Sequence, residues 1–281
     1  MGSKPSLFAA GAPVTPGGLP PQTALMTQRA VFTEAYAVIP GGCMTDIVTS
    51  LLPGWTGMRM WVLARPLTGF SETFSHYLVE LAAGGGCTEP EVDGAAQSVL
   101  YVAEGGLNLT LDGVTRHLIS GGYAWIAPGA DWALASESGA RFHWIRKRWV
   151  PAAGVSAPGS FVSHEDDAAT VAMPRTDGRW ATTRFVDPED IAHDCHVNIV
   201  TFQPGGTIPF EETHVMEHGL FVLEGKAVYK LNRDWVEVQA GDFMWLRAFC
   251  PQACYAGGPG RFRYLLYKDV NRHAALGGTF G

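Results

Sequence analysis

A short stretch in the second half of the chain carries three side chains of the kinds that bind metals in proteins. Glu212, His214 and His218 follow one another at even spacings. Successive side chains of an extended chain point to opposite sides, so an even spacing places all three on one face. Gln252 can supply an amide oxygen from a neighbouring strand. We therefore expect a metal site built from two imidazoles, a carboxylate and an amide oxygen.

The chemistry of this donor set narrows the metal without fixing it. Mixed nitrogen and oxygen ligands suit Mn²⁺, Fe²⁺, Ni²⁺ or Zn²⁺, and the absence of a thiolate argues against a structural zinc. Taken alone, the stretch is equally compatible with a solvated hairpin. It is also compatible with a polar helix face that carries His214 and His218 four positions apart. An internal repeat favours the metal site over both of these readings.

The two halves of the chain match when one is shifted against the other by 120 positions without a gap. A constant offset over several motifs indicates a duplicated structural unit. The matched segments are Ser75-His76-Tyr77 with Cys195-His196-Val197, Tyr101–Gly105 with Phe221–Gly225, Gly121 with Gly241, and Trp125 with Trp245.

The same shift makes the first copy an internal control for the metal site. The positions that correspond to Glu212, His214, His218 and Gln252 are held by Val92, Gly94, Ser98 and Trp132. None of these side chains ligates a metal well. The first copy is therefore expected to be structural, with the chemistry confined to the second.

The remaining pattern is β throughout, with short runs of Val, Ile, Tyr, Phe and Trp punctuated by Gly, Pro or Asp. It predicts an all-β chain of two tandem antiparallel jelly-roll barrels. We expect an N-terminal extension over 1–26, a first barrel over 27–155, a linker over 156–190 and a second barrel over 191–281. Expected strands are His76–Leu81, Val99–Ala103, Leu107–Leu111, Tyr123–Ile126 and Phe142–Trp149, and one helical turn is expected at Asp187–Ile191.

Composition limits the partners and the compartment. The net charge is −7 and no run of Lys or Arg stands out, so neither nucleic acid nor a membrane is an expected partner. The N-terminus does not have the pattern of a secretory signal. Five cysteines, an odd number without a C-x-x-C pair, indicate reduced thiols in a cytoplasmic protein.

Several other polar residues have no ligand-spaced partners. His76 and His196 occupy equivalent repeat positions and are expected to be structural. The basic segment Trp144–Trp149 is expected to pair with acids of the linker or of the other barrel. The single histidines are expected to be exposed, namely His117, His143, His164, His193 and His273.

The pattern Gly-x5-Glu-x-His-x3-His-x6-Gly resembles the first cupin motif, with Glu212 in the place of the usual first His and His218 in the place of the usual Glu. The second motif departs further, with Arg247, Phe249 and Gln252 where Pro, Gly and His are usual. Together with Tyr267–Arg272, these features are similar to the two-barrel (bicupin) (S)-ureidoglycine aminohydrolases of purine (allantoin) catabolism. The resemblance extends from about Thr27 to Arg272.

The resemblance implies a hydrolase that releases ammonia from (S)-ureidoglycine to give (S)-ureidoglycolate. It implies Mn²⁺ held by Glu212, His214, His218 and Gln252, with Tyr229, Tyr264 and Lys268 as substrate contacts beside Glu212 and Gln252. Glu212 and Lys268 are the expected catalytic residues, and a homo-oligomer is the expected assembly. Two alternatives stay open: another metal cupin, such as a sugar-acid isomerase or a dioxygenase, and a non-catalytic cupin that binds a small acid.

Overall fold

The computed structural model describes residues 29–44, 49–66 and 69–270, and this part of the chain is almost entirely β-structure. Its one helix is the 3₁₀ turn Gly41–Cys43, and none is long and apolar enough to cross a bilayer. The helical turn expected near Asp187 is wrong. Asp187 Oδ1 instead accepts the N–H of Glu189 at 2.9 Å and closes a tight turn, the alternative that Asp side chains offer the backbone. The expected extension over 1–26 and His273 lie outside the described residues.

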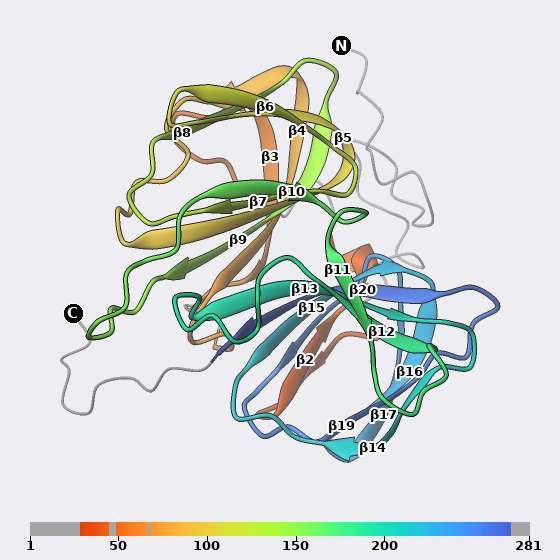
Figure 1. Cartoon of the computed structure of the whole chain (residues 1–281). Helices are drawn as coiled ribbons and strands as arrows, with labels where there is room; N and C mark the ends of the chain where they lie inside the picture. The colour runs from red at the N-terminus through yellow and green to blue at the C-terminus, as the bar shows by residue number, and fades with distance from the viewer. Residues whose placement is uncertain (1–28, 45–48, 67–68, 271–281) are drawn as a thin grey trace, which may run out of the picture.

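The first unit is one sheet that closes on itself, drawn in orange to light green in Figure 1. Two long strands, β4 and β5, run across it and pair with most of the others. The predicted strands lie within β4, β5, β7 and β9 except for Trp149, which follows the end of β9, and Val99–Ala103 and Leu107–Leu111 form one continuous strand. The strands of this unit are β3 (Thr56–Ala64), β4 (Ser75–Cys87), β5 (Ala96–Leu111), β6 (Val114–Ile119), β7 (Gly122–Ile126), β8 (Trp132–Ser136) and β9 (Ala140–Arg148).

The second unit is a sandwich whose two sheets enclose an apolar core. One sheet has eight strands in the order β1 (Val31–Phe32), β2 (Tyr36–Ile39), β18 (Phe243–Leu246), β15 (His218–Glu224), β20 (Phe262–Asp269), β13 (Cys195–Phe202), β12 (Trp180–Arg184) and β11 (Ala169–Ala172). The other has four, in the order β14 (Thr207–Glu212), β19 (Gln252–Tyr255), β16 (Lys226–Leu231) and β17 (Asp234–Gln239). Side chains from both sheets meet in one buried cluster between them.

The strands of the two units repeat features at the offset of 120 positions that the sequence shows. Strands β6 and β17 begin and end 120 positions apart, and β5 and β15 carry a register shift at equivalent places. Gly105 and Gly225 follow these shifts, and both have φ of 76°. A Cβ atom would lie 2.2 Å from the Gly139 carbonyl oxygen at the first and 2.1 Å from that of Arg261 at the second. Only glycine fits such a bulge, which is why both copies keep it.

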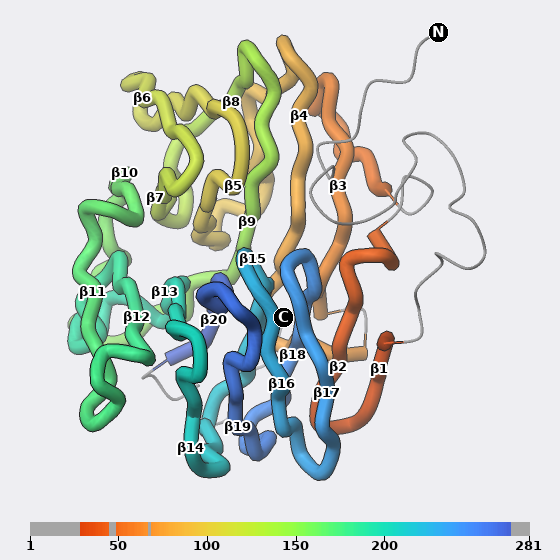
Figure 2. The backbone as a smooth tube through the Cα atoms, turned by 90° about the vertical axis from the view of Figure 1, so that its right-hand side faces the viewer, coloured from red at the N-terminus to blue at the C-terminus, as the bar shows by residue number. Residues whose placement is uncertain are grey.

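Strands that lie before and after the first unit in the chain extend the sheets of both units. Strand β2 precedes the first unit in the chain but pairs with β18 of the second. Strand β10 (Phe161–His164) follows the first unit and pairs with its β7. The segment expected as a linker, 156–190, thus holds three strands, β10, β11 and β12, that extend the sheets of both units. Figure 2 shows β1 and β2 in red beside β18, and the green strands β10 to β12 along the opposite side of the molecule.

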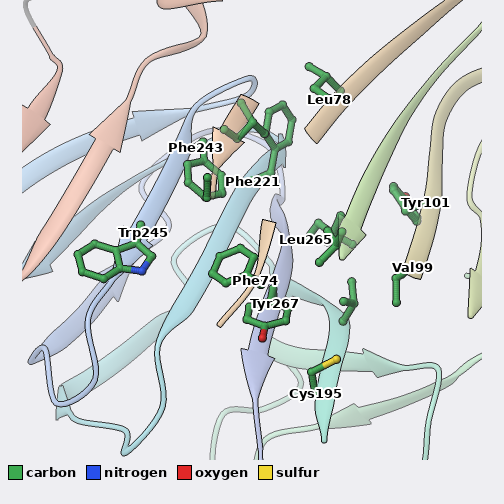
Figure 3. Packing of buried hydrophobic residues seen from close by; sticks show 14 of the residues in the cluster. Phe74, Leu78, Val99, Tyr101, Cys195, Phe221, Phe243, Trp245, Leu265 and Tyr267 are labelled. Atoms are coloured by element: carbon green, nitrogen blue, oxygen red, sulfur yellow. The ribbon is translucent and has the colours of Figure 1, made fainter. Parts of the chain in front are cut away.

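A second large core lies between the units, and Figure 3 shows side chains of both units in contact there. The basic segment Trp144–Trp149 contributes an ion pair to this junction. Lys147 Nζ lies 2.7 Å from Asp194 Oδ2, and both side chains are buried. The expected pairing with an inter-barrel acid is confirmed for Lys147, whereas Arg146 and Arg148 pair with acids of their own unit.

Two of the histidines expected at the surface, His143 and His193, are buried, so that expectation is wrong for them. His143 Nδ1 lies 3.0 Å from His76 Nε2, in a fully buried pair. Burial disfavours the charged imidazole and lowers the pKa of His76 to about 3. The pKa of His143 is lowered as well, by burial first and then by the charges of His76 and Arg141.

These pKa values predict that stability depends on pH. A histidine protonates near pH 6.5 in the unfolded chain but stays neutral when folded, so stability present above that pH is lost as the pH falls towards 3. The slope is up to about 1.4 kcal/mol per pH unit for each buried histidine. Urea unfolding from about pH 7 down to about pH 5 measures it. We expect a shallower slope for the double variant His76→Leu/His143→Leu, and an unchanged one for His117→Leu at an exposed site. Parallel slopes for all three proteins would contradict the assignment.

Candidate metal and substrate site

The four expected ligands come from both sheets of the second unit. Glu212 ends β14 and Gln252 begins β19, and the two residues are opposite one another in that strand pair. His214 lies in the connection that follows β14, and His218 begins β15 in the facing sheet. Strand pairing on one side and a five-residue connection on the other thus bring all four to the same end of the sandwich.

Two of the ligand atoms face each other at the spacing of a shared ion. Glu212 Oε1 lies 3.2 Å from His214 Nε2. Two ligands at about 2.1 Å from a metal and at right angles to each other are about 3 Å apart. The rings of His214 and His218 have centroids 4.9 Å apart at 65°. Among the described residues no group of three His, Cys, Asp or Glu side chains converges as a metal site, so Glu212, His214 and His218 do not by themselves form a closed ligand set in this structure.

The protonation states at this end of the sandwich suit nitrogen and oxygen ligation. Burial first, and then the charges of His214 and Lys268, lower the pKa of His218 to about 3, so its imidazole is neutral and able to bind a metal. The nearby thiol of Cys254 is also buried, which raises its pKa to about 12. In the protein without a bound metal this thiol is therefore protonated at neutral pH.

The two tyrosines expected as substrate contacts meet inside the sandwich. Tyr229 comes from β16 of one sheet and Tyr264 from β20 of the other, with ring centroids 6.3 Å apart in an edge-on arrangement. Both are buried, and burial raises both pKa values above the ordinary value. The charge of Glu212 also raises the pKa of Tyr264, which places the two groups in electrostatic range. Both hydroxyls remain protonated donors.

Lys268 lies in a row of side chains across three neighbouring strands, and this row includes the expected metal ligand His218. It is opposite His218 on one neighbouring strand and opposite His196 on the other. Residues opposite one another in a sheet point to the same face, so all three face the inside of the sandwich. Burial lowers the pKa of Lys268, and the charge of Arg184 lowers it further.

His196 and Arg184 are neighbours of this site that the sequence reading missed. His196 was expected to be structural, and Arg184 falls in the expected linker. The alternation of side chains along β13 could have indicated His196. It is an even number of positions from Val200 and Phe202, which point into the core, so its side chain points the same way. The sequence carried no comparable signal for Arg184, since its strand was not predicted.

The equivalent region of the first unit is filled by indole rings. Trp132 and Trp144 stand at the places of Gln252 and Tyr264 and lie 6.0 Å apart between ring centroids. Ser98, at the place of His218, accepts a hydrogen bond from Trp144 Nε1 at 3.0 Å. Val92, at the place of Glu212, is 88% exposed. Apolar packing thus replaces the ligand set in this copy.

Comparisons with known proteins agree with this architecture. The family model described as "Cupin domain" matches residues 198–267. The chain is 64% identical to a Pseudomonas aeruginosa protein described as glyoxylate-induced, whose crystal structure superposes with a TM-score of 0.87 over 94% of this chain and 97% of that one. The protein Ylba of Escherichia coli is 26% identical, with a TM-score of 0.77 over 92% and 100% of the two chains. Oxalate decarboxylase of Bacillus subtilis, at 12% identity and a TM-score of 0.64 over 88% and 80%, shares the fold. The architecture is therefore that of a two-barrel cupin.

Two curated relatives carry the same name. The (S)-ureidoglycine aminohydrolase of Escherichia coli is 30% identical over 257 residues, which cover 90% of this chain and 95% of the relative. That of Arabidopsis thaliana is 32% identical over 248 residues, which cover 87% and 79%. This similarity spans both cupin units, including the end of the second unit that carries Glu212, His214, His218 and Gln252. The chain belongs to the (S)-ureidoglycine aminohydrolase family of hydrolases.

Proposed function

We propose that this protein releases ammonia from (S)-ureidoglycine to give (S)-ureidoglycolate, in the breakdown of purines through allantoin. The observation that carries the proposal is the facing pair of Glu212 and His214 beside the buried, neutral His218, in a chain whose curated relatives bear the name of this activity. The reaction consumes one water. The bond from the aminal carbon to the amine nitrogen breaks, and a bond from that carbon to the water oxygen forms.

The proposed cofactor is Mn²⁺, held by Glu212, His214, His218 and Gln252. When bound, such an ion polarises the reacting centre and orients the amine. Two features of the described residues support the fit: oxygen donors from Glu212 and Gln252, and a neutral buried imidazole. Mn²⁺ favours carboxylate and carbonyl oxygen over sulfur.

The remaining residues are assigned to binding and proton transfer. Lys268 presents a cation to the substrate carboxylate from the row that contains His218. Tyr229 and Tyr264 present protonated hydroxyls from opposite sheets. We assign to Glu212 the movement of a proton between water and the leaving amine, as a general acid and base. A cytoplasmic homo-oligomer is the proposed state of the protein, and the absence of any disulfide among its five cysteines supports a reducing compartment.

Ammonia release from (S)-ureidoglycine tests the function directly. The substrate is generated in situ from allantoate by allantoate amidohydrolase, and the enzyme is stripped of metal and assayed with and without Mn²⁺. We expect a Mn²⁺-dependent rate well above spontaneous decay, with formation of the S product. No acceleration by metal-loaded protein would refute the proposal and leave the other metal-cupin activities and a non-catalytic binding protein.

A further inference from the structure

The inner face of the large sheet carries a second cation close to Lys268. Arg184 ends β12, where side chains alternate between the two faces. Trp180, four positions earlier, stacks on Phe202 in the core of the sandwich with ring centroids 5.7 Å apart. Arg184 is an even number of positions from Trp180, so its side chain points to the same inner face of the sheet.

The strand register places Arg184 beside the row that contains Lys268. Thr182 is opposite Val200, and the same antiparallel ladder continued by two residues brings Arg184 next to Asn198. His196, two residues from Asn198 on the same face of β13, is opposite Lys268. Arg184 and Lys268 therefore flank β13 from its two sides, on the face that His218 shares.

Neither cation has an anionic partner among the described residues. In the part of the chain that the structure describes, no ion pair or hydrogen bond reaches the guanidinium of Arg184 or the ammonium of Lys268. Both side chains are half-buried, and the positive charge of Arg184 reaches Lys268 and His196. Two like charges that are partly removed from water destabilise one another, and an anion bound between them offsets that cost.

Two buried polar atoms lie in the same place without partners. His196 and Asn198 are 2% and 3% exposed. His196 Nε2 and Asn198 Oδ1 make no hydrogen bond to any described residue. Most buried polar groups in folded proteins have a partner, so two orphans on adjacent inward positions indicate a group that the protein itself does not supply.

We infer that Arg184 is a second cationic contact for the substrate carboxylate, shared with Lys268, and that His196 and Asn198 line the same subsite. This inference rests on the proposed function and names a further specificity residue within it. A planar guanidinium can donate two parallel hydrogen bonds to one carboxylate, which an ammonium cannot do. The orphaned Asn198 Oδ1 is an acceptor for an N–H of the ureido group.

Steady-state kinetics of the Mn²⁺-loaded protein give the first test. Arg184→Met is expected to raise KM for (S)-ureidoglycine by about 10- to 100-fold, the loss of one charged hydrogen-bonding contact, with a smaller change in kcat. Arg184→Lys keeps the charge and is expected to restore part of the affinity. Arg179→Met is the matched control, because Arg179 is exposed just before the same strand. Its kinetics are expected to be those of the unchanged protein.

Binding of two non-reactive probes gives a readout that does not depend on turnover. N-carbamoylglycine has the carboxylate and ureido group of the substrate but no leaving amine, and N-carbamoylglycinamide lacks the charge as well. The unchanged protein is expected to bind the acid at least about 10-fold more tightly than the amide by calorimetry, and Arg184→Met is expected to lose most of that preference.

The outcomes separate this inference from the proposed function. If ammonia release is normal but Arg184→Met keeps both its KM and its preference for the acid, Arg184 is not a carboxylate contact. If no ammonia is released but the preference for the acid depends on Arg184, the anion subsite stands and the proposed reaction is wrong. If Arg184→Met does not fold, Arg184→Lys decides: unchanged KM and unchanged preference would overturn the bidentate contact, and a raised KM with kcat retained would support it.

Discussion

His218→Ala is expected to abolish both metal retention and turnover while the protein stays folded. The substitution removes one imidazole ligand from the start of β15, where the side chain is only 5% exposed. Loss of a residue that merely supports a ligand costs about 10- to 100-fold in metal affinity, so loss of the ligand itself is expected to cost more. Metal content after dialysis and ammonia release measure the two effects.

Ser98→Ala is the matched control, because Ser98 stands at the equivalent position of the first unit. Its hydroxyl accepts a hydrogen bond from buried Trp144, so the change is expected to cost about 1 kcal/mol of stability. Metal content and turnover are expected to be unchanged. Equal loss of metal from both variants would contradict a single site in the second unit.

Glu217→Ala is expected to produce the largest loss of stability. The Glu217 carboxylate is buried at the junction of the units, immediately before His218. It accepts hydrogen bonds from the backbone N–H groups of Glu72 and Thr73, from the Thr73 hydroxyl at 2.5 Å and from Trp245 Nε1 at 2.7 Å. Truncation leaves several donors without a partner, at about 1–3 kcal/mol for each that stays buried. We expect the free energy of unfolding to fall by about 3–5 kcal/mol.

Glu34→Ala is the control for that loss. Glu34 is exposed and lines the same cavity of about 900 Å³ as Glu217. Its removal is expected to change the free energy of unfolding by less than about 0.5 kcal/mol. Chemical denaturation of both variants measures the difference. A change below about 1 kcal/mol for Glu217→Ala would mean that water replaces the carboxylate at the junction.

Much of the fold could be predicted because the relevant signals are local or periodic. The offset of 120 positions predicted the equivalence of the two units, and strands β6 and β17 conform to it at both ends. Alternation was expected to place Glu212, His214 and His218 on one face, but His214 lies in the irregular connection after β14, and it is this connection that brings its ring to within 3.2 Å of Glu212. The first copy was predicted to lack the ligand set, and of its equivalent positions Trp132 packs against Trp144 while Ser98 accepts a hydrogen bond from Trp144.

Other features could not be predicted, since they depend on which strands pair across long separations. The pairing of β2 with β18 changes no local pattern, and neither does the pairing of β10, β11 and β12 that makes three strands of the expected linker part of the sheets. The burial of His143 and His193 follows from the docking of one unit on the other. The burial of a single histidine cannot be predicted from its neighbours in the chain when the buried surface forms only where two distant segments meet.

The sequence by itself thus determined the duplicated β-architecture and the group of ligand-type residues, because both are written in spacings of a few residues or in one constant offset. Only the tertiary structure decided what surrounds those residues. Register across β12, β13 and β20 sets Arg184 and His196 beside Lys268, and no local preference of any of these segments encodes that register. Burial then sets the protonation of His218, since desolvation depends on the whole core and not on neighbouring residues in the chain.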